Sequence, residues 1–120
     1  MKDIIKERIL VLDGALGTMI QQYGLTEADF RGEEFKNHPV KLEGNNDILV
    51  LTRPDIISNI HRQYLEAGAD IIETCTFNSQ AISQTEYQTT DFVYRINIEA
   101  ARLARKEADR MTALTPDKPR

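Results

Sequence analysis

Aliphatic residues gather in two short segments that each adjoin a glycine turn. The first run, Ile9–Leu12, ends at Asp13 and Gly14, and the second, Ala69–Thr74, follows Gly68. Short continuous aliphatic runs are typical of strands that are covered on both faces. The pattern therefore predicts two buried strands of the parallel type.

Four other segments show the residue spacing or the end signals of helices. They are Ala15–Tyr23, Pro54–Ala67, Gln80–Tyr87 and Phe92–Met111. Pro54 is typical of a first helical turn, and Gly68 is typical of the position just past a helix end. Ser79 and Asp91 are expected to cap the third and fourth of these helices.

A long, mostly polar connection runs from Gly24 to Arg53. Loops of this length inside compact domains are usually either functional or disordered. The apolar residues Ile48–Leu51 near its end are expected to pack as a short strand or a turn.

The order strand, helix, strand, helix is typical of an α/β protein with a parallel sheet. A two-stranded unit is marginal by itself, and a (β/α)8 barrel takes about 250 residues. The sequence therefore predicts one domain over residues 1–120, an incomplete (β/α)8 TIM barrel. It would comprise the first two β/α units, with a long insertion in the region of the first strand and helix. The uncovered sheet edge and helix faces favour a homo-oligomer.

Composition and charge exclude several classes of protein. The chain has 120 residues, 41% of them hydrophobic, and its 15 basic and 19 acidic residues give a net charge of −4. This balance does not indicate a basic surface that would bind nucleic acid or an anionic membrane. Nothing resembles a signal peptide or a membrane span, and the single Cys75 cannot form an internal disulfide. A reducing, cytoplasmic location is expected.

The first candidate site follows the first predicted strand, at Asp13-Gly14-Ala15. The Asp13 carboxylate could hold an ammonium group, and the backbone N–H groups of Gly14 and Ala15 could hold a carboxylate. These residues are therefore candidates for binding a zwitterion. The alternative is that Asp13 merely caps the following helix.

The second candidate site follows the second predicted strand and includes Glu73, Thr74 and Thr76. Polar residues at the carboxyl end of a barrel strand point into the usual active-site face. The alternative is a polar loop that leads into a helix capped by Ser79. A lone cysteine is more often an inert buried residue than a nucleophile, so Cys75 is expected to be inert.

A metal site inside the chain is not expected. Zinc requires four ligands, or three and an open position, and Cys75, His38 and His61 lie far apart in sequence. His61 is expected to be packed or solvent-facing and His38 exposed. No residue of the chain is assigned a catalytic role.

Several blocks of the chain resemble the opening of the homocysteine S-methyltransferase domain of the cobalamin-dependent methionine synthases. The blocks are Ile9–Gln21, Glu27–Glu33, Leu42–Leu49, Ala67–Ser79 and Leu114–Arg120. The motifs Glu-Ala-Asp-Phe-Arg-Gly and Gly-Asn-Asn-Asp favour these synthases over relatives that use betaine or S-methylmethionine. The chain departs from the pattern at Cys75, where these synthases usually carry asparagine.

The resemblance implies a (β/α)8 barrel that binds homocysteine and, with zinc, transfers a methyl group from methylcobalamin to its thiol to give methionine. It places the three zinc cysteines on later strands and the folate, cobalamin and S-adenosylmethionine modules further along. The fragment is therefore expected to bind neither zinc nor cobalamin and to be inactive alone. The homocysteine site carries over to Asp13, Gly14, Ala15, Glu73, Thr74 and Thr76. The alternative is a standalone, non-catalytic module that binds an amino acid or a partner protein.

Overall fold

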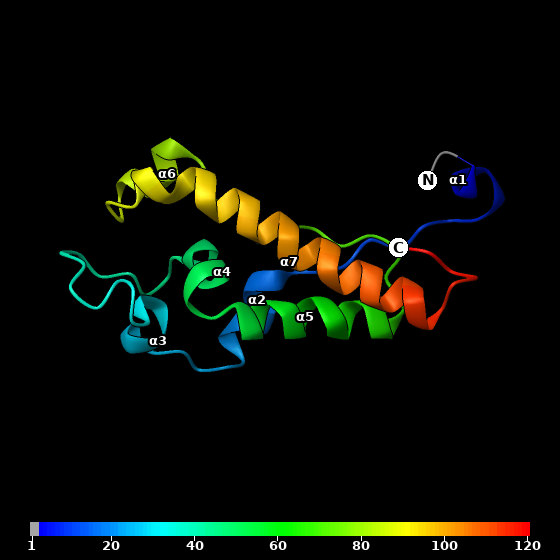
Figure 1. Cartoon of the computed structure of the whole chain (residues 1–120), viewed down its shortest axis with the longest axis horizontal. Helices are drawn as coiled ribbons and strands as arrows, with labels where there is room; N and C mark the ends of the chain where they lie inside the picture. Colours follow the sequence, from blue (N-terminus) through cyan, green and yellow to red (C-terminus); the bar gives the residue numbers. More distant parts are fainter. Residues whose placement is uncertain (1–2) are drawn as a thin grey trace.

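The computed structural model describes residues 3–120, an elongated molecule that measures 51 × 26 × 21 Å (Figure 1). The helices, in chain order, are α1 (Ile4–Glu7), α2 (Leu16–Gln21), α3 (Glu27–Arg31), η1 (Asn46–Ile48), α4 (Leu49–Thr52), α5 (Pro54–Ala67), α6 (Ala81–Thr85), η2 (Thr90–Phe92) and α7 (Val93–Leu114). The two labelled η are short 3-10 helices. Together the helices take up more than half of the described residues.

The predicted α/β fold, an incomplete TIM barrel built from two β/α units, is wrong for this structure. Residues 3–120 contain no sheet, and their β-type pairing is a single isolated parallel bridge between Leu12 and Ile71. The two predicted strands are extended segments that meet at this bridge. The architecture is therefore helical, with one short point of contact between two extended segments.

Side-chain carboxylates end the pairing on both sides of the bridge. Two backbone bonds form it, from Ile71 N to Val11 O (3.2 Å) and from Asp13 N to Ile71 O (2.9 Å). The next N–H groups of a parallel ladder would donate to backbone carbonyls. Instead, Val11 N donates to Asp70 Oδ2 and Glu73 N donates to Asp13 Oδ2, both at 3.0 Å. Without a third strand, this short pairing does not grow into a sheet.

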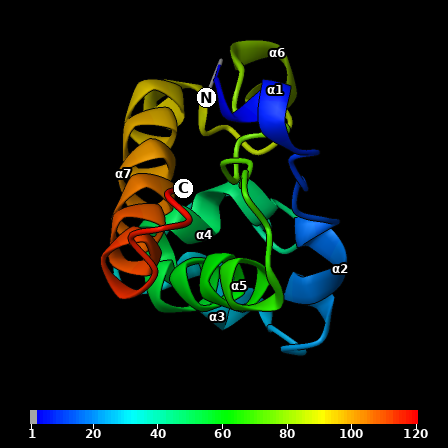
Figure 2. The ribbon, with the colours of Figure 1, turned by 90° about the vertical axis from the view of Figure 1, so that its right-hand side faces the viewer.

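The two long helices α5 and α7 lie side by side along the molecule, as the end view in Figure 2 shows. The sequence prediction for α5 is confirmed, because the helix runs from Pro54 to Ala67. Gly68 follows with φ of 113°, a backbone conformation that favours glycine. Ile57 and Ile60 of α5 are completely buried.

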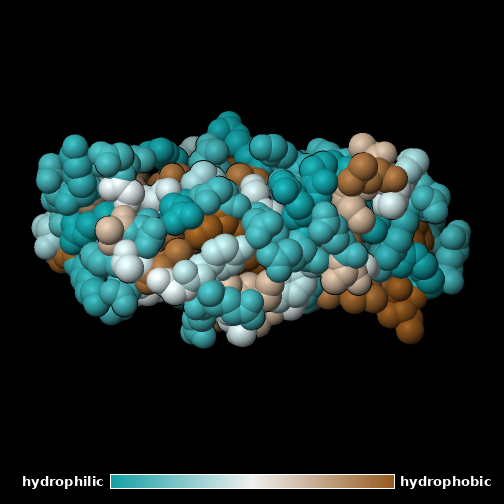
Figure 3. Space-filling view, turned by 90° about the horizontal axis from the view of Figure 1, so that it is seen from below, coloured by the Kyte–Doolittle hydropathy of each residue, from teal (hydrophilic) through white to brown (hydrophobic). Residues whose placement is uncertain are grey.

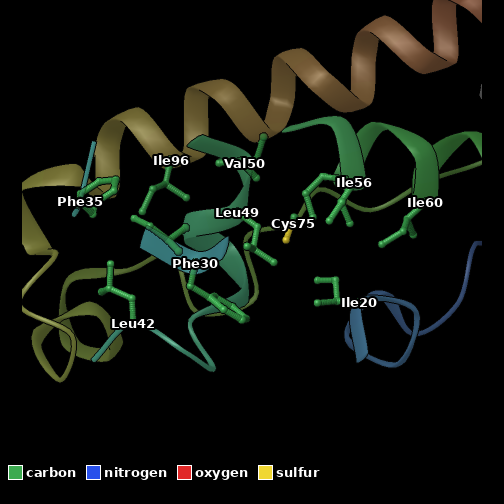
Figure 4. Close-up of a cluster of buried hydrophobic side chains, with 13 residues drawn as sticks. Ile20, Phe30, Phe35, Leu42, Leu49, Val50, Ile56, Ile60, Cys75 and Ile96 are labelled. Atoms are coloured by element: carbon green, nitrogen blue, oxygen red, sulfur yellow. The ribbon is translucent and has the colours of Figure 1, made fainter. Parts of the chain in front are cut away.

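The hydrophobic core joins α4, α5 and α7 to the segments that precede them (Figure 4). Its buried members are Ile20, Phe30, Phe35, Leu42, Ile48, Leu49, Val50, Ile56, Ile57, Ile60, Cys75, Ile96 and Ala100. Most of these residues come from helices, so the burial of apolar surface stabilises the helical body rather than a sheet.

Both predicted helix caps near the end of the chain are wrong. Gln80 caps α6, because its side chain accepts a hydrogen bond from Ile82 N, whereas Ser79 is buried. Asp91 lies inside η2, and Phe92 precedes α7 without a capping side chain. Otherwise α6 and α7 form within a few residues of the predicted ranges.

The connection from Gly24 to Arg53 is folded. Thr26 and Asp29 form a capping box at the start of α3, with Asp29 Oδ2 accepting from Thr26 N at 2.9 Å. The Arg31 guanidinium then bonds four backbone carbonyls between residues 35 and 40, which fixes the following turn. Ile48–Leu51 belongs to η1 and α4, so the predicted strand or turn there is wrong.

Apolar side chains are exposed on the first extended segment. Ile9 is 88% exposed, and about half of Val11 and of Leu12 is exposed. Figure 3 shows brown apolar surface at the right-hand end of the molecule, where Figure 1 places α1. Self-association through this surface stays a prediction. Within residues 3–120, no helix combines the length and the apolar character that a membrane crossing requires.

Candidate functional site

A hollow of about 760 Å³ opens where the two extended segments meet the helical body. This volume lies within the range of small-molecule binding sites. The residues that line it are Asp13, Gly14, Ala15, Leu16, Gly17, Asn46, Asp47, Ile72, Glu73, Thr74, Cys75, Thr76, Phe77 and Asn78. All six predicted site residues are among them. The structure therefore brings the two candidate sites of the sequence together in one place.

Asp13 lies at the end of the first extended segment and is half-buried. Its Oδ2 atom accepts a hydrogen bond from Glu73 N at 3.0 Å. Its Oδ1 atom is buried and has no hydrogen-bond partner within residues 3–120. Burial raises the pKa of the Asp13 carboxyl, and the charge of Glu73 raises it further, while the hydrogen bond from Glu73 N lowers it. A cationic donor beside Oδ1 would relieve this unfavourable environment.

The alternative that Asp13 caps the next helix is wrong. Ala15 is the residue that precedes α2, and it makes no side-chain cap. The N–H groups of Gly14 and Ala15 donate no hydrogen bond within the described residues, and both residues are exposed. They are therefore free to donate to a bound carboxylate.

Gly14 is a point of close approach between this segment and α5. A Cβ atom there would stand 3.1 Å from Tyr64 Oη and 3.2 Å from Tyr64 Cε1. The Tyr64 hydroxyl also donates to Ala15 O at 3.3 Å. Tyr64 thus supports the Asp13–Ala15 wall of the hollow from behind, and a glycine leaves it room.

Glu73, Thr74 and Thr76 also line the hollow, with Glu73 next to Asp13. Glu73 and Thr74 are exposed, and Thr76 is partly buried. The hydroxyl oxygens of Thr74 and Thr76 lie 2.7 Å apart, and Thr76 N donates to Thr74 O at 2.9 Å. These contacts hold the two threonines in a tight turn with their polar groups beside the hollow.

Sequence reasoning missed Asn46, Asp47 and Asn78. Asp47 is 3% exposed and accepts hydrogen bonds from Asn78 N (2.7 Å) and Ser79 Oγ (2.8 Å). Burial raises the pKa of Asp47, whereas these hydrogen bonds lower it. The run Gly-Asn-Asn-Asp was a visible signal, but it falls in what the sequence indicated to be a connection.

The charge of the hollow is acidic. Its charged lining residues are Asp13, Asp47 and Glu73, and no lysine, arginine or histidine of the described chain lines it. An ammonium group is therefore the charged group that the hollow favours. A carboxylate would have to be bound by neutral N–H donors.

Cys75 is a lining residue of the hollow whose thiol is buried. Its side chain is 3% exposed, and Figure 4 shows its sulfur within the hydrophobic core. Sγ lies 3.6 Å from Asn46 O and 3.8 Å from Asp47 Oδ1. Burial, and then the charge of Asp47, raises the pKa of the thiol far above its ordinary value. The expectation of an inert, buried cysteine agrees with this environment.

No metal site forms among residues 3–120, where no three His, Cys, Asp or Glu side chains come together suitably. His61 is completely buried in α5. His38, expected to be exposed, is instead partly buried, with its Nε2 atom 2.7 Å from Tyr87 O. The residues present thus do not fit zinc, and the location of the zinc ligands stays a prediction.

Comparison with known protein families gives one match that covers almost the whole chain. The family model described as homocysteine S-methyltransferase matches residues 10–120. The match includes both extended segments apart from Ile9, and all the residues that line the hollow.

Proposed function

The chain belongs to the homocysteine S-methyltransferase family, and on this premise we propose that the hollow beside Asp13 binds homocysteine by its amino-acid end. Members of this family are methyltransferases, and the family name identifies the sulfur of homocysteine as the methyl acceptor. Homocysteine carries an α-ammonium group and an α-carboxylate at one end and a thiol at the other. The proposal concerns recognition of the charged end.

The observation that carries the proposal is the environment of Asp13 Oδ1. This oxygen is buried without a partner, while Oδ2 of the same carboxylate is bonded to Glu73 N. The α-ammonium group of homocysteine supplies an N–H donor and a positive charge, which an unpaired carboxylate oxygen requires. Because a charge-assisted hydrogen bond is roughly twice as strong as a neutral one, this contact would dominate binding.

The free N–H groups of Gly14 and Ala15 complement that contact. They adjoin Asp13 in sequence and donate no hydrogen bond within the described chain. We propose that they bind the α-carboxylate. Glu73, Thr74 and Thr76 also line the hollow and are proposed as looser polar contacts.

We further propose that the chain belongs to the cobalamin-dependent branch of methionine synthases. The blocks Glu27–Gly32 and Gly44–Asp47, which resemble that branch, support this assignment. When bound, zinc would lower the pKa of the homocysteine thiol. Zinc has no ligand set among residues 3–120. No part of the proposed recognition of homocysteine is therefore assigned to zinc or to cobalamin.

The proposal is tested by titrating L-homocysteine into the protein under reducing conditions and measuring the heat of binding. The Asp13→Asn variant removes the negative charge and keeps the size of the side chain. We expect an affinity at least tenfold weaker, about 1.4 kcal/mol, because a charge-assisted bond is lost. The exposed Asp117 provides the control variant Asp117→Asn, with unchanged affinity. Equal affinity of wild type and Asp13→Asn would exclude the proposed contact.

A further inference from the structure

The backbone of Asn78 is held on both sides by buried polar side chains. Its N–H donates to Asp47 Oδ2 at 2.7 Å, and its carbonyl accepts from Gln84 Nε2 at 3.1 Å. Asp47 is 3% exposed and Gln84 is completely buried. These two hydrogen bonds to the Asn78 backbone form a clamp. Asp47 precedes Asn78 by 31 residues, so the clamp joins segments that are distant in sequence.

The groups that form the clamp are themselves fixed. Gln84 exchanges hydrogen bonds with the buried Asn45, at 2.9 and 3.2 Å, and its Oε1 accepts from Thr89 Oγ1 at 2.6 Å. Taking carboxylate and amide groups out of water is unfavourable unless each is well bonded. Burying these groups therefore has a free-energy cost, which their mutual hydrogen bonds offset. The result is a fixed position for the backbone of Asn78.

The residue that is held so firmly has a free side chain. Asn78 is exposed and lines the hollow, and its side-chain amide makes no hydrogen bond within residues 3–120. A fixed backbone beneath an unoccupied polar side chain is the arrangement that preorganises a binding contact, because the contact then costs little ordering on binding.

We propose that the Asn78 side chain binds the α-carboxylate of the amino-acid ligand and that Asp47 and Gln84 are its positioning residues. No cationic side chain of the described chain lines the hollow, so a carboxylate depends on neutral donors there. The Asn78 Nδ2 atom is one such donor, and it adds to the N–H groups of Gly14 and Ala15. The inference rests on the proposed function, because it concerns the same ligand in the same hollow.

The first test compares two ligands on wild type and on Asn78→Ala. L-homocysteine carries both charged groups, whereas 3-aminopropane-1-thiol lacks the α-carboxylate. We expect Asn78→Ala to weaken L-homocysteine about tenfold, since a hydrogen bond to a charged group is lost. The affinity for 3-aminopropane-1-thiol should stay the same. Asn37→Ala, at an exposed asparagine, serves as the control.

Three outcomes overturn the inference. If Asn78→Ala binds L-homocysteine as well as wild type does, Asn78 is no contact, and the Asp13 proposal still stands. If both ligands weaken equally, the effect is structural and not a carboxylate contact. If wild type binds no L-homocysteine, the proposed function fails and this inference fails with it.

The second test addresses the positioning role of Asp47. Asp47→Ala removes the acceptor for Asn78 N and should weaken L-homocysteine in the wild-type background. It should add no weakening to Asn78→Ala, because it acts through that side chain. Asp47→Asn keeps an oxygen that can accept from Asn78 N, so it should bind L-homocysteine more tightly than Asp47→Ala and nearly as tightly as wild type. This variant also provides the test if Asp47→Ala folds poorly. Ser79→Ala removes a different hydrogen bond to Asp47 Oδ2 and should leave the affinity unchanged. Independent, additive losses would contradict the positioning role.

Discussion

The helical body and the first extended segment are held in place by different means. In the body, α4, α5 and α7 surround a continuous hydrophobic core whose central residues are completely buried. The segment Ile9–Ala15 buries little apolar surface, and Ile9, Val11 and Leu12 are exposed. The segment is held by the backbone bridge to Ile71 and by hydrogen bonds that the carboxylates of Asp13 and Asp70 accept from backbone N–H groups.

The difference matters for function because the hollow lies between the two regions. The wall that contains Asn78 is anchored in the body through buried side chains, whereas the wall that contains Asp13 is supported by a few hydrogen bonds and by Tyr64. Asp13 itself both ends the backbone pairing and offers an unpartnered oxygen. We therefore expect stability to reside mainly in the helical body and ligand recognition to depend on the segment Ile9–Ala15.

The largest expected effect contrasts two isoleucines, one from each region. Ile57 in α5 is completely buried, whereas Ile9 is 88% exposed. Ile57→Ala should lower the free energy of unfolding by about 2–5 kcal/mol, because it removes packed methyl groups and leaves a cavity. Ile9→Ala should change it by less than about 0.5 kcal/mol. Urea denaturation measures both. Similar losses would mean that the segment contributes to the core after all.

A smaller effect is expected from His61, which is buried in the body with neither ring nitrogen hydrogen-bonded within residues 3–120. Burial lowers its pKa in the folded protein, and the opposing effect of Glu107 is weaker. The unfolded chain therefore takes up a proton near pH 6.5 while the folded chain resists it. Stability is full above that pH and falls as the pH drops through the window below it, by up to about 1.4 kcal/mol per pH unit.

The control for that prediction is His61→Leu, which replaces the imidazole by an apolar side chain. In His61→Leu, the free energy of unfolding measured between pH 5.5 and pH 8 should depend less steeply on pH than in wild type, because the contribution of His61 is removed. An identical slope in wild type and His61→Leu would show that other groups are responsible.

The smallest expected effect compares two glycines of the hollow. A Cβ on Gly14 would meet Tyr64 at 3.1 Å, whereas on Gly17 the nearest atom, Asn46 Nδ2, is at an ordinary 3.6 Å. Gly14→Ala should cost no more than about 1 kcal/mol of stability, since the tip of the tyrosine ring can move. Gly17→Ala lies within α2 and should be neutral or stabilising by up to about 1 kcal/mol.

The two variants should differ more in binding than in stability. Displacing Tyr64 disturbs the bond to Ala15 O and hence the free N–H groups beside Asp13. We therefore expect weaker L-homocysteine binding in Gly14→Ala and no change in Gly17→Ala. The reverse order in a titration would contradict the role given to Tyr64.

The helical elements were the most predictable part of the fold. Pro54 and Gly68 mark both ends of α5, and the predicted bounds are those observed. The helix α3 was missed inside a polar stretch, although Thr26 and Asp29 provide a capping box. The strands were wrong because aliphatic runs cannot reveal that the carboxylates of Asp13 and Asp70 take the N–H groups that a ladder needs.

For the candidate site, the sequence identified six residues that line one hollow, although their binding role stays a prediction. Asn78 was visible but was not selected, because nothing local distinguishes it from its neighbours. Its significance depends on Asp47 and Gln84, which reach it from other elements. Contacts of this kind follow from tertiary structure and not from the pattern of a single segment.

The proposed pairing between Asp13 and the α-ammonium group of the ligand is the central contact of the site. A double cycle measures it: L-homocysteine and 4-mercaptobutyrate, which lacks the amine, are each titrated into wild type and Asp13→Asn. We predict that the substitution weakens L-homocysteine at least tenfold and leaves 4-mercaptobutyrate unchanged or tighter, because an opposing charge is removed. Equal weakening of both ligands, or of neither, would contradict the account.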